Sequence, residues 1–236
     1  KLCLRISGFP KLNFFRKFLW RISSNKISKV MCPTNDTVQY LKSKKIFNND
    51  IFCLEDPVLQ IRNVPKKKFD KTLDPKFVKE NIILIGRLTK QKNFELLIKA
   101  FSKIIRQHPS LKANILGDGE LKKSLKESID NYGLSKNIIL LGHKKNVFKY
   151  LFNSKFFILT SLWEDPGFVL VEAASVNKLI ISSNCKNGPE EFLDYGKGGL
   201  LFENNSVDSL IKNIETAMKL KESDYKKMIL QSKKQT

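Results

Sequence analysis

The chain has 236 residues, of which 42% are hydrophobic and 28% are charged. This balance is typical of a folded globular protein and excludes a disordered one, and no apolar run approaches the length of a membrane-spanning helix. Lys and Arg number 43 against 23 Asp and Glu, a formal net charge of +20. Such an excess favours nucleic acid, anionic lipid or phosphorylated small molecules as partners, although compositional drift toward lysine is an equal explanation.

Four cysteines lie far apart in the sequence, and none belongs to a C-x-x-C pair. Their spacing gives no metal-ligand motif and indicates a reduced chain with buried thiols, so we expect a cytoplasmic protein. The sequence begins with Lys1 inside a strand-like run rather than with Met. We therefore expect an upstream portion to precede it.

The first part of the chain, residues 1–58, predicts short strands at KLCLRIS, ISKVMCPT and DIFCLE and a short helix near 36–41. The stretch LNFFRKFLWRIS has an apolar stripe with basic residues beside it: Phe15, Phe18, Leu19 and Ile22, with Arg16, Lys17 and Arg21. The stripe predicts a helix packed on its own domain, with binding to an anionic membrane surface as the alternative. The polar residues 60–77 then predict a linker or surface loop.

From residue 81 onward, short β-rich runs alternate with helix-length segments. The runs are NIILI, ANIL, NIILL, KFFIL, KLIIS and GLLF. Apolar residues spaced three and four apart mark helices between the first five runs. This alternation predicts right-handed crossovers and a parallel sheet with helices on both faces, that is, an α/β fold with a Rossmann-like domain.

Glycines and polar residues gather where these strands end. They include Gly86-Arg87 after NIILI, Gly117-Asp118-Gly119 after ANIL, Gly142-His143 after NIILL, TSLWEDPG after KFFIL and SNCKNGPEE after KLIIS. Ligands bind at the carboxyl ends of parallel strands, so the sequence predicts a ligand-binding edge of the sheet. His143 is a candidate lining residue of that edge, with an ordinary surface histidine as the alternative.

The segment EDPGFVLVEAA, residues 164–174, is the most informative one. Pro166 and Gly167 suit a turn that opens a helix, and the N–H groups of its first turn favour a phosphate. Glu172 lies in the apolar run FVLVEAA, and a buried carboxylate must meet hydrogen-bond donors. Sugar hydroxyls are one set of donors, and a Lys or Arg side chain from a neighbouring strand is the alternative.

Two cations follow the first strand of this part of the chain. Arg87 comes directly after the strand, and Lys92 stands near the start of the next helix. Together they suit an anion site, whereas two surface cations of a lysine-rich chain are the alternative. No P-loop, no G-x-G-x-x-G fingerprint and no Cys/His metal spacing is present.

In this order the segments resemble the retaining glycosyltransferases of family 4, which have the two-domain GT-B fold. The resemblance rests on Glu164 and Glu172, with seven residues between them, and on GRLTKQKN, ILGDGE, LLGHKKNV and GPEEFLDYGKGGLLF. It implies transfer of a sugar from a nucleotide-diphosphate sugar to a hydroxyl of a cell-surface polysaccharide or lipid-linked glycan. It also implies retention of configuration, and neither a metal nor another cofactor is expected.

The resemblance assigns roles to single residues. The candidates for catalysis are Glu164, Arg87 and Lys92. The candidates for donor binding are Glu172, Gly167, Phe168, Gly86, Gly117 and His143. In this interpretation Arg87 and Lys92 neutralise the donor diphosphate, and Glu172 holds the ribose hydroxyls. Glu164 faces the transferred sugar, and N–H groups around Gly167 contact the sugar or phosphate.

The sequence departs from the family pattern at three positions. Asp165 and Pro166 replace a Gly-aromatic pair after the first Glu, and Asn93 replaces a common Gly. The family also places an acceptor domain before the donor domain. We therefore expect an incomplete N-terminal domain, with residues 1–58 as the last part of that acceptor domain, followed by a donor-binding domain over 59–236.

The expected location is cytoplasmic, with peripheral contact to an anionic membrane on the inner face of the plasma membrane. No nucleic-acid partner is expected of the glycosyltransferase. Two other interpretations remain open from the sequence: a basic nucleic-acid-binding module, and a non-catalytic fragment that binds a donor.

Overall fold

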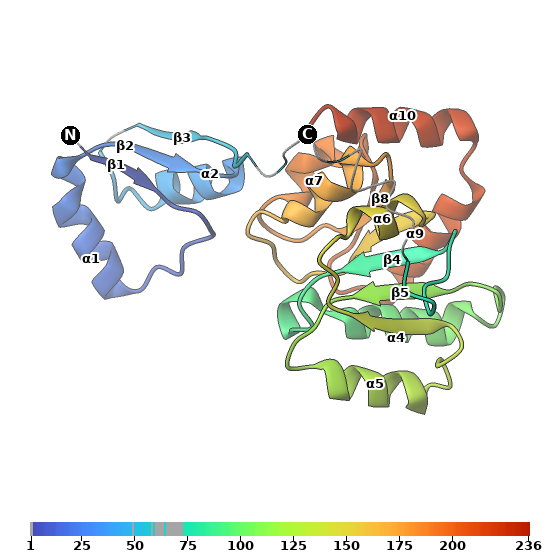
Figure 1. The fold of residues 1–236 in the computed structure, drawn as a ribbon. Coiled ribbons are helices and arrows are strands. Elements are labelled where there is room, and N and C mark those ends of the chain that lie inside the picture. The colour runs from blue at the N-terminus through green and yellow to red at the C-terminus, as the bar shows by residue number, and fades with distance from the viewer. Residues whose placement is uncertain (1, 49, 58, 60–63, 65–72) are drawn as a thin grey trace.

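The computed structural model describes residues 2–48, 50–57, 59, 64 and 73–236, and within them the strands form two parallel sheets (Figure 1). The smaller sheet has the order β1-β2-β3 and the larger one β6-β5-β4-β7-β8-β9. The strands are β1 (Leu2–Arg5), β2 (Ile27–Cys32), β3 (Ile51–Cys53), β4 (Ile82–Ile85), β5 (Ala113–Leu116), β6 (Ile138–Gly142), β7 (Phe156–Leu159), β8 (Leu179–Ser183) and β9 (Leu200–Phe202). The predicted α/β fold is confirmed.

Helices connect the strands of both sheets. They are α1 (Phe14–Ser23), α2 (Asn35–Ser43), α4 (Phe94–Ile104), α5 (Lys122–Asn131), α6 (Phe148–Phe152), α7 (Phe168–Ser175), α8 (Pro189–Phe192), α9 (Val207–Lys219) and α10 (Glu222–Lys233). Short 3₁₀ turns lie at η1 (Ser24–Lys26), η3 (Lys90–Lys92) and η4 (Asp194–Gly196). Helix α10 packs on α7 and β8 near the C-terminus (Figure 1).

The order of the larger sheet determines where a ligand can bind. The chain adds β5 and β6 on one side of β4 and then crosses to add β7, β8 and β9 on the other side. All adjacent strands run parallel. The direction of winding therefore reverses between β4 and β7, and in doubly wound sheets the ligand crevice lies outside the carboxyl ends of the strands at this switch point.

Both faces of the larger sheet are buried, because successive side chains of a strand point to opposite faces. Ile82 and Leu84 face a core that includes side chains of α4, α5 and α9. Ile83, between them, faces a second core that includes side chains of α6 and α7. This burial on two sides explains why the strands are continuous apolar runs rather than alternating ones.

The smaller sheet has a core of its own, in which Val30 of β2 and Leu41 of α2 are fully buried. Helix α1 contributes no buried residue to it. Its predicted stripe is open to solvent, with Phe15 67%, Phe18 54% and Ile22 60% exposed. The expectation that this stripe packs on its own domain is therefore wrong within the described residues. The helix turns Trp20 toward the core instead, with its ring 5.4 Å from that of Phe47.

The predicted linker and the predicted domain boundary at 58/59 lie largely outside the described residues, so both stay predictions. Among the residues that the structure describes, no helix combines the length and apolar character needed to cross a membrane.

Candidate functional site

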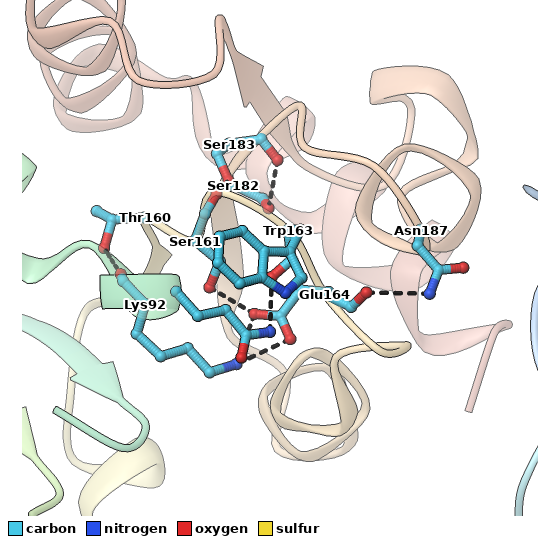
Figure 2. Close-up of polar contacts among 9 residues, drawn as sticks. Lys92, Thr160, Ser161, Trp163, Glu164, Ser182, Ser183 and Asn187 are labelled. Carbon is cyan, nitrogen blue, oxygen red and sulfur yellow. Dashed lines mark hydrogen bonds and ion pairs between the residues drawn. The ribbon is translucent and has the colours of Figure 1, made fainter. Parts of the chain in front are cut away.

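The loops after β4 and β7 meet at the switch point of the larger sheet. The Thr160 hydroxyl donates a hydrogen bond to the Lys92 carbonyl oxygen at 2.8 Å, and the Leu162 N–H donates to the Gln91 carbonyl at 2.8 Å. The Gln91 side-chain amide returns a bond of 2.9 Å to the Trp163 carbonyl. These contacts fix the position of η3, which carries Lys92, relative to the loop that carries Glu164 (Figure 2).

Lys92 and Glu164 form a buried ion pair at the centre of this junction (Figure 2). The Lys92 Nζ donates to both carboxylate oxygens of Glu164, at 2.6 and 2.8 Å. The Ser161 hydroxyl donates to the same carboxylate at 2.5 Å. Glu164 is 2% exposed and the Lys92 side chain 16%. A buried charge needs such partners, because its desolvation otherwise costs several kcal/mol.

The sequence assigned the buried position to the wrong carboxylate. Glu172 is half-buried on α7, whereas Glu164 is the buried acid. The α-helical period turns Leu170, Ala173 and Ala174 inward, and Glu172 lies outside that buried face, one turn beyond Phe168. The cation that pairs with the buried acid Glu164 is Lys92, which lies in η3.

Arg87 and Lys92 point to different environments. Arg87 is exposed after β4, while Lys92 is turned inward to Glu164. His143 is exposed after β6, at the same edge of the sheet. The pKa of the Asp118 carboxyl is lowered, chiefly by the hydrogen bond from Lys122, then by the Gly119 N–H, and to a smaller extent by the charge of His143. Among the described residues, Lys92 and Glu164 are in contact, whereas Arg87 and His143 are exposed to solvent at the edge where the strands end.

Two of the predicted glycines are required by the backbone. Gly117 has φ +149°, and a Cβ there would lie 1.8 Å from the carbonyl oxygen of Gly86. Gly167 has φ +92°, and a Cβ there would lie 3.2 Å from the Glu164 Cγ. Gly86 itself packs against the aliphatic part of Lys92. Gly117 therefore lets the loops after β4 and β5 approach closely, and Gly167 lets the start of α7 pack against the Glu164 side chain.

The departure at Asn93 has a backbone explanation. Asn93 precedes α4 with φ +48°, in the left-handed region. Glycine adopts this conformation freely, and asparagine is the residue that tolerates it next best. The substitution therefore preserves the turn that presents Lys92.

Sequence reasoning missed Ser161 and Asn187, which both contact the Glu164 segment. The Asn187 side-chain amide donates to the Glu164 carbonyl oxygen at 3.0 Å (Figure 2). Both residues follow buried strands of the larger sheet, β7 and β8. Their position at strand ends was the available signal, but small polar residues are common there. Among the described residues no group of three or more His, Cys, Asp or Glu is placed to hold a metal ion.

A pocket of about 340 Å³ is lined by residues from both the N-terminal part of the chain and the part that carries the larger sheet, and neither Lys92 nor Glu164 is among its lining residues. Of the predicted site residues, Gly167 and Phe168 line it. Thr34, Asp56 and Glu191 contribute polar groups to its wall. The loop before α7 therefore lies between this pocket and the Lys92–Glu164 pair.

A doubly wound sheet beside a second parallel sheet, with the polar site at the switch point, is the GT-B arrangement. The crystal structure of the Anabaena protein HepE in complex with UDP matches it with a TM-score of 0.80 at 16% identity. The match covers 98% of this chain and 66% of that protein. A likeness at this identity shows the fold, and the predicted GT-B fold is confirmed.

The family model for glycosyl transferases group 1 matches residues 66–235, so the chain belongs to this family. An uncharacterised glycosyltransferase of Methanocaldococcus jannaschii is 42% identical over 139 residues, 58% of this chain and 34% of the relative. The N-acetylgalactosamine-N,N'-diacetylbacillosaminyl-diphospho-undecaprenol 4-alpha-N-acetylgalactosaminyltransferase of Campylobacter jejuni is 31% identical over 192 residues, 76% of this chain and 52% of the relative. The chain thus spans about a third of the first relative and about half of the second.

Proposed function

We propose that this chain contains the donor-binding part of an enzyme that transfers a sugar from a nucleotide-diphosphate sugar to a hydroxyl of a glycan or lipid-linked acceptor. We include retention of configuration and independence of metal in the proposal. The main support is the Lys92–Glu164 pair, which lies at the switch point of the larger sheet in a chain of the group 1 family. Family membership gives no support to a nucleic-acid-binding module.

The positive charges of Lys92 and Arg87 suit a diphosphate bound at the carboxyl ends of the strands. An ammonium group has three N–H donors, and Glu164 receives two bonds from Lys92, so one donor stays available for a phosphate oxygen. Exposed Arg87 adds a second cation at the same edge. Fixed positive charge at this place stabilises the negative charge that develops on a departing nucleoside diphosphate.

Helix α7 suits the remaining parts of a nucleotide-sugar. Its N-terminus begins after Gly167 with N–H groups that have no partner within the helix, which favour a phosphate or a sugar hydroxyl. Glu172 lies one turn further on and suits the ribose hydroxyls. A carboxylate has about four lone-pair sites, so Glu164 can accept from a sugar hydroxyl in addition to Ser161 and Lys92.

Binding of a nucleoside diphosphate tests this assignment in the intact enzyme. We expect Arg87→Ala and Glu172→Ala each to weaken binding about 10- to 100-fold, because hydrogen bonds to charged groups contribute about 1.5–3 kcal/mol. Arg106→Ala is the matched control for Arg87→Ala, because Arg106 is also exposed but follows α4 at the other end of the sheet. Equal affinities in all three variants and the unchanged protein would exclude the proposed donor site.

We also propose peripheral contact with an anionic membrane through α1. Its exposed side chains combine a large apolar surface with cations: Phe14, Phe15, Phe18, Leu19 and Ile22, with Arg16, Lys17 and Arg21. An amphipathic helix of this type binds at the level of the lipid headgroups. The Campylobacter relative is named for an undecaprenol-linked acceptor.

Sedimentation with vesicles tests the membrane contact. The double variant Phe15→Ser with Phe18→Ser should lose most of its binding to phosphatidylglycerol vesicles, and the unchanged protein should bind phosphatidylcholine vesicles weakly. Leu230→Ser is a suitable control, because Leu230 on α10 is 61% exposed and far from α1 in the fold (Figure 1). If the double variant binds anionic vesicles as well as this control does, α1 is not the contact surface.

A further inference from the structure

Asn187 is a buried residue that forms hydrogen bonds both to the N-terminal part of the chain and to the loop after β7. It follows β8, is 1% exposed, and has a left-handed backbone with φ +72°. Its side-chain amide donates to the Glu164 carbonyl oxygen at 3.0 Å and to the Asp165 carboxylate at 3.2 Å. The loop that carries the buried acid of the candidate site is thus held in place from one side by this amide.

The carboxamide oxygen of the same side chain accepts hydrogen bonds from two threonines at the start of helix α2. The Thr37 hydroxyl donates to the Asn187 Oδ1 at 2.9 Å, and the Thr34 hydroxyl donates to the same oxygen. The Asn187 N–H donates to the Asp36 carboxylate at 2.9 Å. Thr34 and Thr37 are 4% and 0% exposed, so water does not substitute for these bonds while the parts are docked.

Two further contacts join the same surfaces. The Phe9 N–H, after β1, donates to the Asp165 carboxylate at 2.7 Å. The N–H of Asn35, the first residue of α2, donates to the Glu191 carboxylate at 3.0 Å. The N-terminal part of the chain therefore meets the Glu164 loop and its neighbour at several polar points, and Asn187 is the residue that joins them through one amide.

A second buried asparagine shows that this arrangement is not general. Asn114, on β5, is also fully buried, but its amide bonds to the backbone N–H and carbonyl of Val78 within the same part of the chain. Asn114 therefore forms hydrogen bonds to a segment 36 positions away, whereas Asn187 bonds to residues about 150 positions away in sequence.

We propose that Asn187 is a positioning residue for Glu164, and that it makes the geometry of the Glu164 loop depend on the docking of α2. The chemical role rests on the function proposed above. When α2 is docked, the Thr34 and Thr37 hydroxyls hold the amide in the orientation that bonds the Glu164 carbonyl. When α2 moves away, the amide loses that orientation and the Glu164 carbonyl loses this hydrogen bond.

The effect should appear in turnover more than in donor binding. Lys92 stays in place without α2, because the Thr160 hydroxyl donates to its carbonyl oxygen within the part of the chain that carries the larger sheet. A displacement of about 1 Å in a catalytic group costs about 100-fold in rate. We therefore expect loss of the Asn187 side-chain hydrogen bonds to lower kcat about 10- to 100-fold and to change the donor KM little.

Two variants of the intact enzyme separate the hydrogen bond that Asn187 donates to the Glu164 carbonyl from those that it accepts from Thr34 and Thr37. Asn187→Gly removes the side chain and tolerates the left-handed backbone. Asn187→Asp keeps an acceptor for Thr34 and Thr37 but removes the donor to the Glu164 carbonyl. The control is Asn177→Gly, since Asn177 also has a left-handed backbone, φ +60°, but is exposed after α7. Both Asn187 variants should lower kcat, and the control should not.

Hydrogen exchange gives a readout that does not depend on turnover. In Asn187→Gly, amides in residues 161–168 and in residues 34–38 should both exchange faster than in the Asn177→Gly control. In Asn187→Asp, residues 161–168 should be affected more than residues 34–38, because the bonds to α2 can persist.

The outcomes distinguish this proposal from the proposed function. Absence of transfer in the unchanged enzyme refutes the function, and hydrogen exchange then decides the positioning role alone. Normal kcat in Asn187→Gly, or faster exchange confined to residues 34–38, overturns the positioning role even if Arg87→Ala and Glu172→Ala lose donor binding as expected.

Discussion

The buried ion pair makes an asymmetric prediction about stability. In Lys92→Met the stem of the side chain is kept and the charge is lost, which leaves the Glu164 carboxylate, 2% exposed, with Ser161 as its remaining side-chain donor. Breaking a buried pair in this way costs about 3–5 kcal/mol. In a domain of this size each kcal/mol lowers Tm by about 2–4 °C, so we expect Tm to fall by about 10 °C.

Removal of the other partner should cost less. In Glu164→Gln the amide can still bond to Ser161, and the Lys92 side chain, 16% exposed, can reach water. We expect a loss of about 1–2 kcal/mol for this variant. The double variant should be more stable than Lys92→Met alone, because it no longer leaves a charge buried without its partner.

Urea unfolding followed by circular dichroism measures the four proteins of this double-mutant cycle. A surface control is Lys103→Met, which breaks the pair with Asp208, whose side chains are 59% and 83% exposed. That change should cost less than about 0.5 kcal/mol. If Lys92→Met is no more destabilising than Glu164→Gln, or than the surface control, Lys92 and Glu164 do not form a desolvated ion pair.

Two further predictions concern the backbone and the thiols. Gly117→Ala should destabilise the protein by at least about 3 kcal/mol, because its Cβ would lie 1.8 Å from the Gly86 carbonyl oxygen. Gly133→Ala is the control and should cost about 1 kcal/mol, because Gly133 has φ +67° but open space around it. Comparable urea midpoints for the two variants would contradict this prediction. Burial raises the pKa of the Cys185 thiol to about 11, while Cys3 is exposed. Since the thiolate is the reactive form, iodoacetamide at pH 8 should modify Cys3 at least about 100-fold faster, and mass spectrometry of the labelled peptides would expose equal rates.

Much of the fold could be predicted because its signals are local. The run NIILI and its counterparts predict the strands of the larger sheet, and strand β4 occupies residues Ile82–Ile85 of that run. Apolar residues spaced three and four apart predict α4, from which Phe94, Leu97 and Ile98 are buried. Alternation of strand and helix allows few topologies, so the parallel sheet, with the carboxyl ends of its strands at one edge, followed from the order of elements.

Burial of single side chains at the site was not predictable in the same way. The run FVLVEAA indicates a helix but not which side of it meets the sheet, and Glu172 is accordingly half-buried rather than buried. For α1, the stripe of Phe15 and Phe18 was expected inside and lies outside, because Trp20 occupies the inward side. Periodicity identifies a helix and its apolar face, but the partner of that face lies elsewhere in the chain.

By itself, the sequence of this protein determined the strands, the helices and the set of polar residues that follow the strands, because each depends on neighbours within a few positions. The tertiary structure alone decided which of those residues meet. Lys92 and Glu164 are 72 positions apart, and Thr37 and Asn187 are 150 apart. The desolvation that gives both contacts their importance arises when distant segments exclude water together.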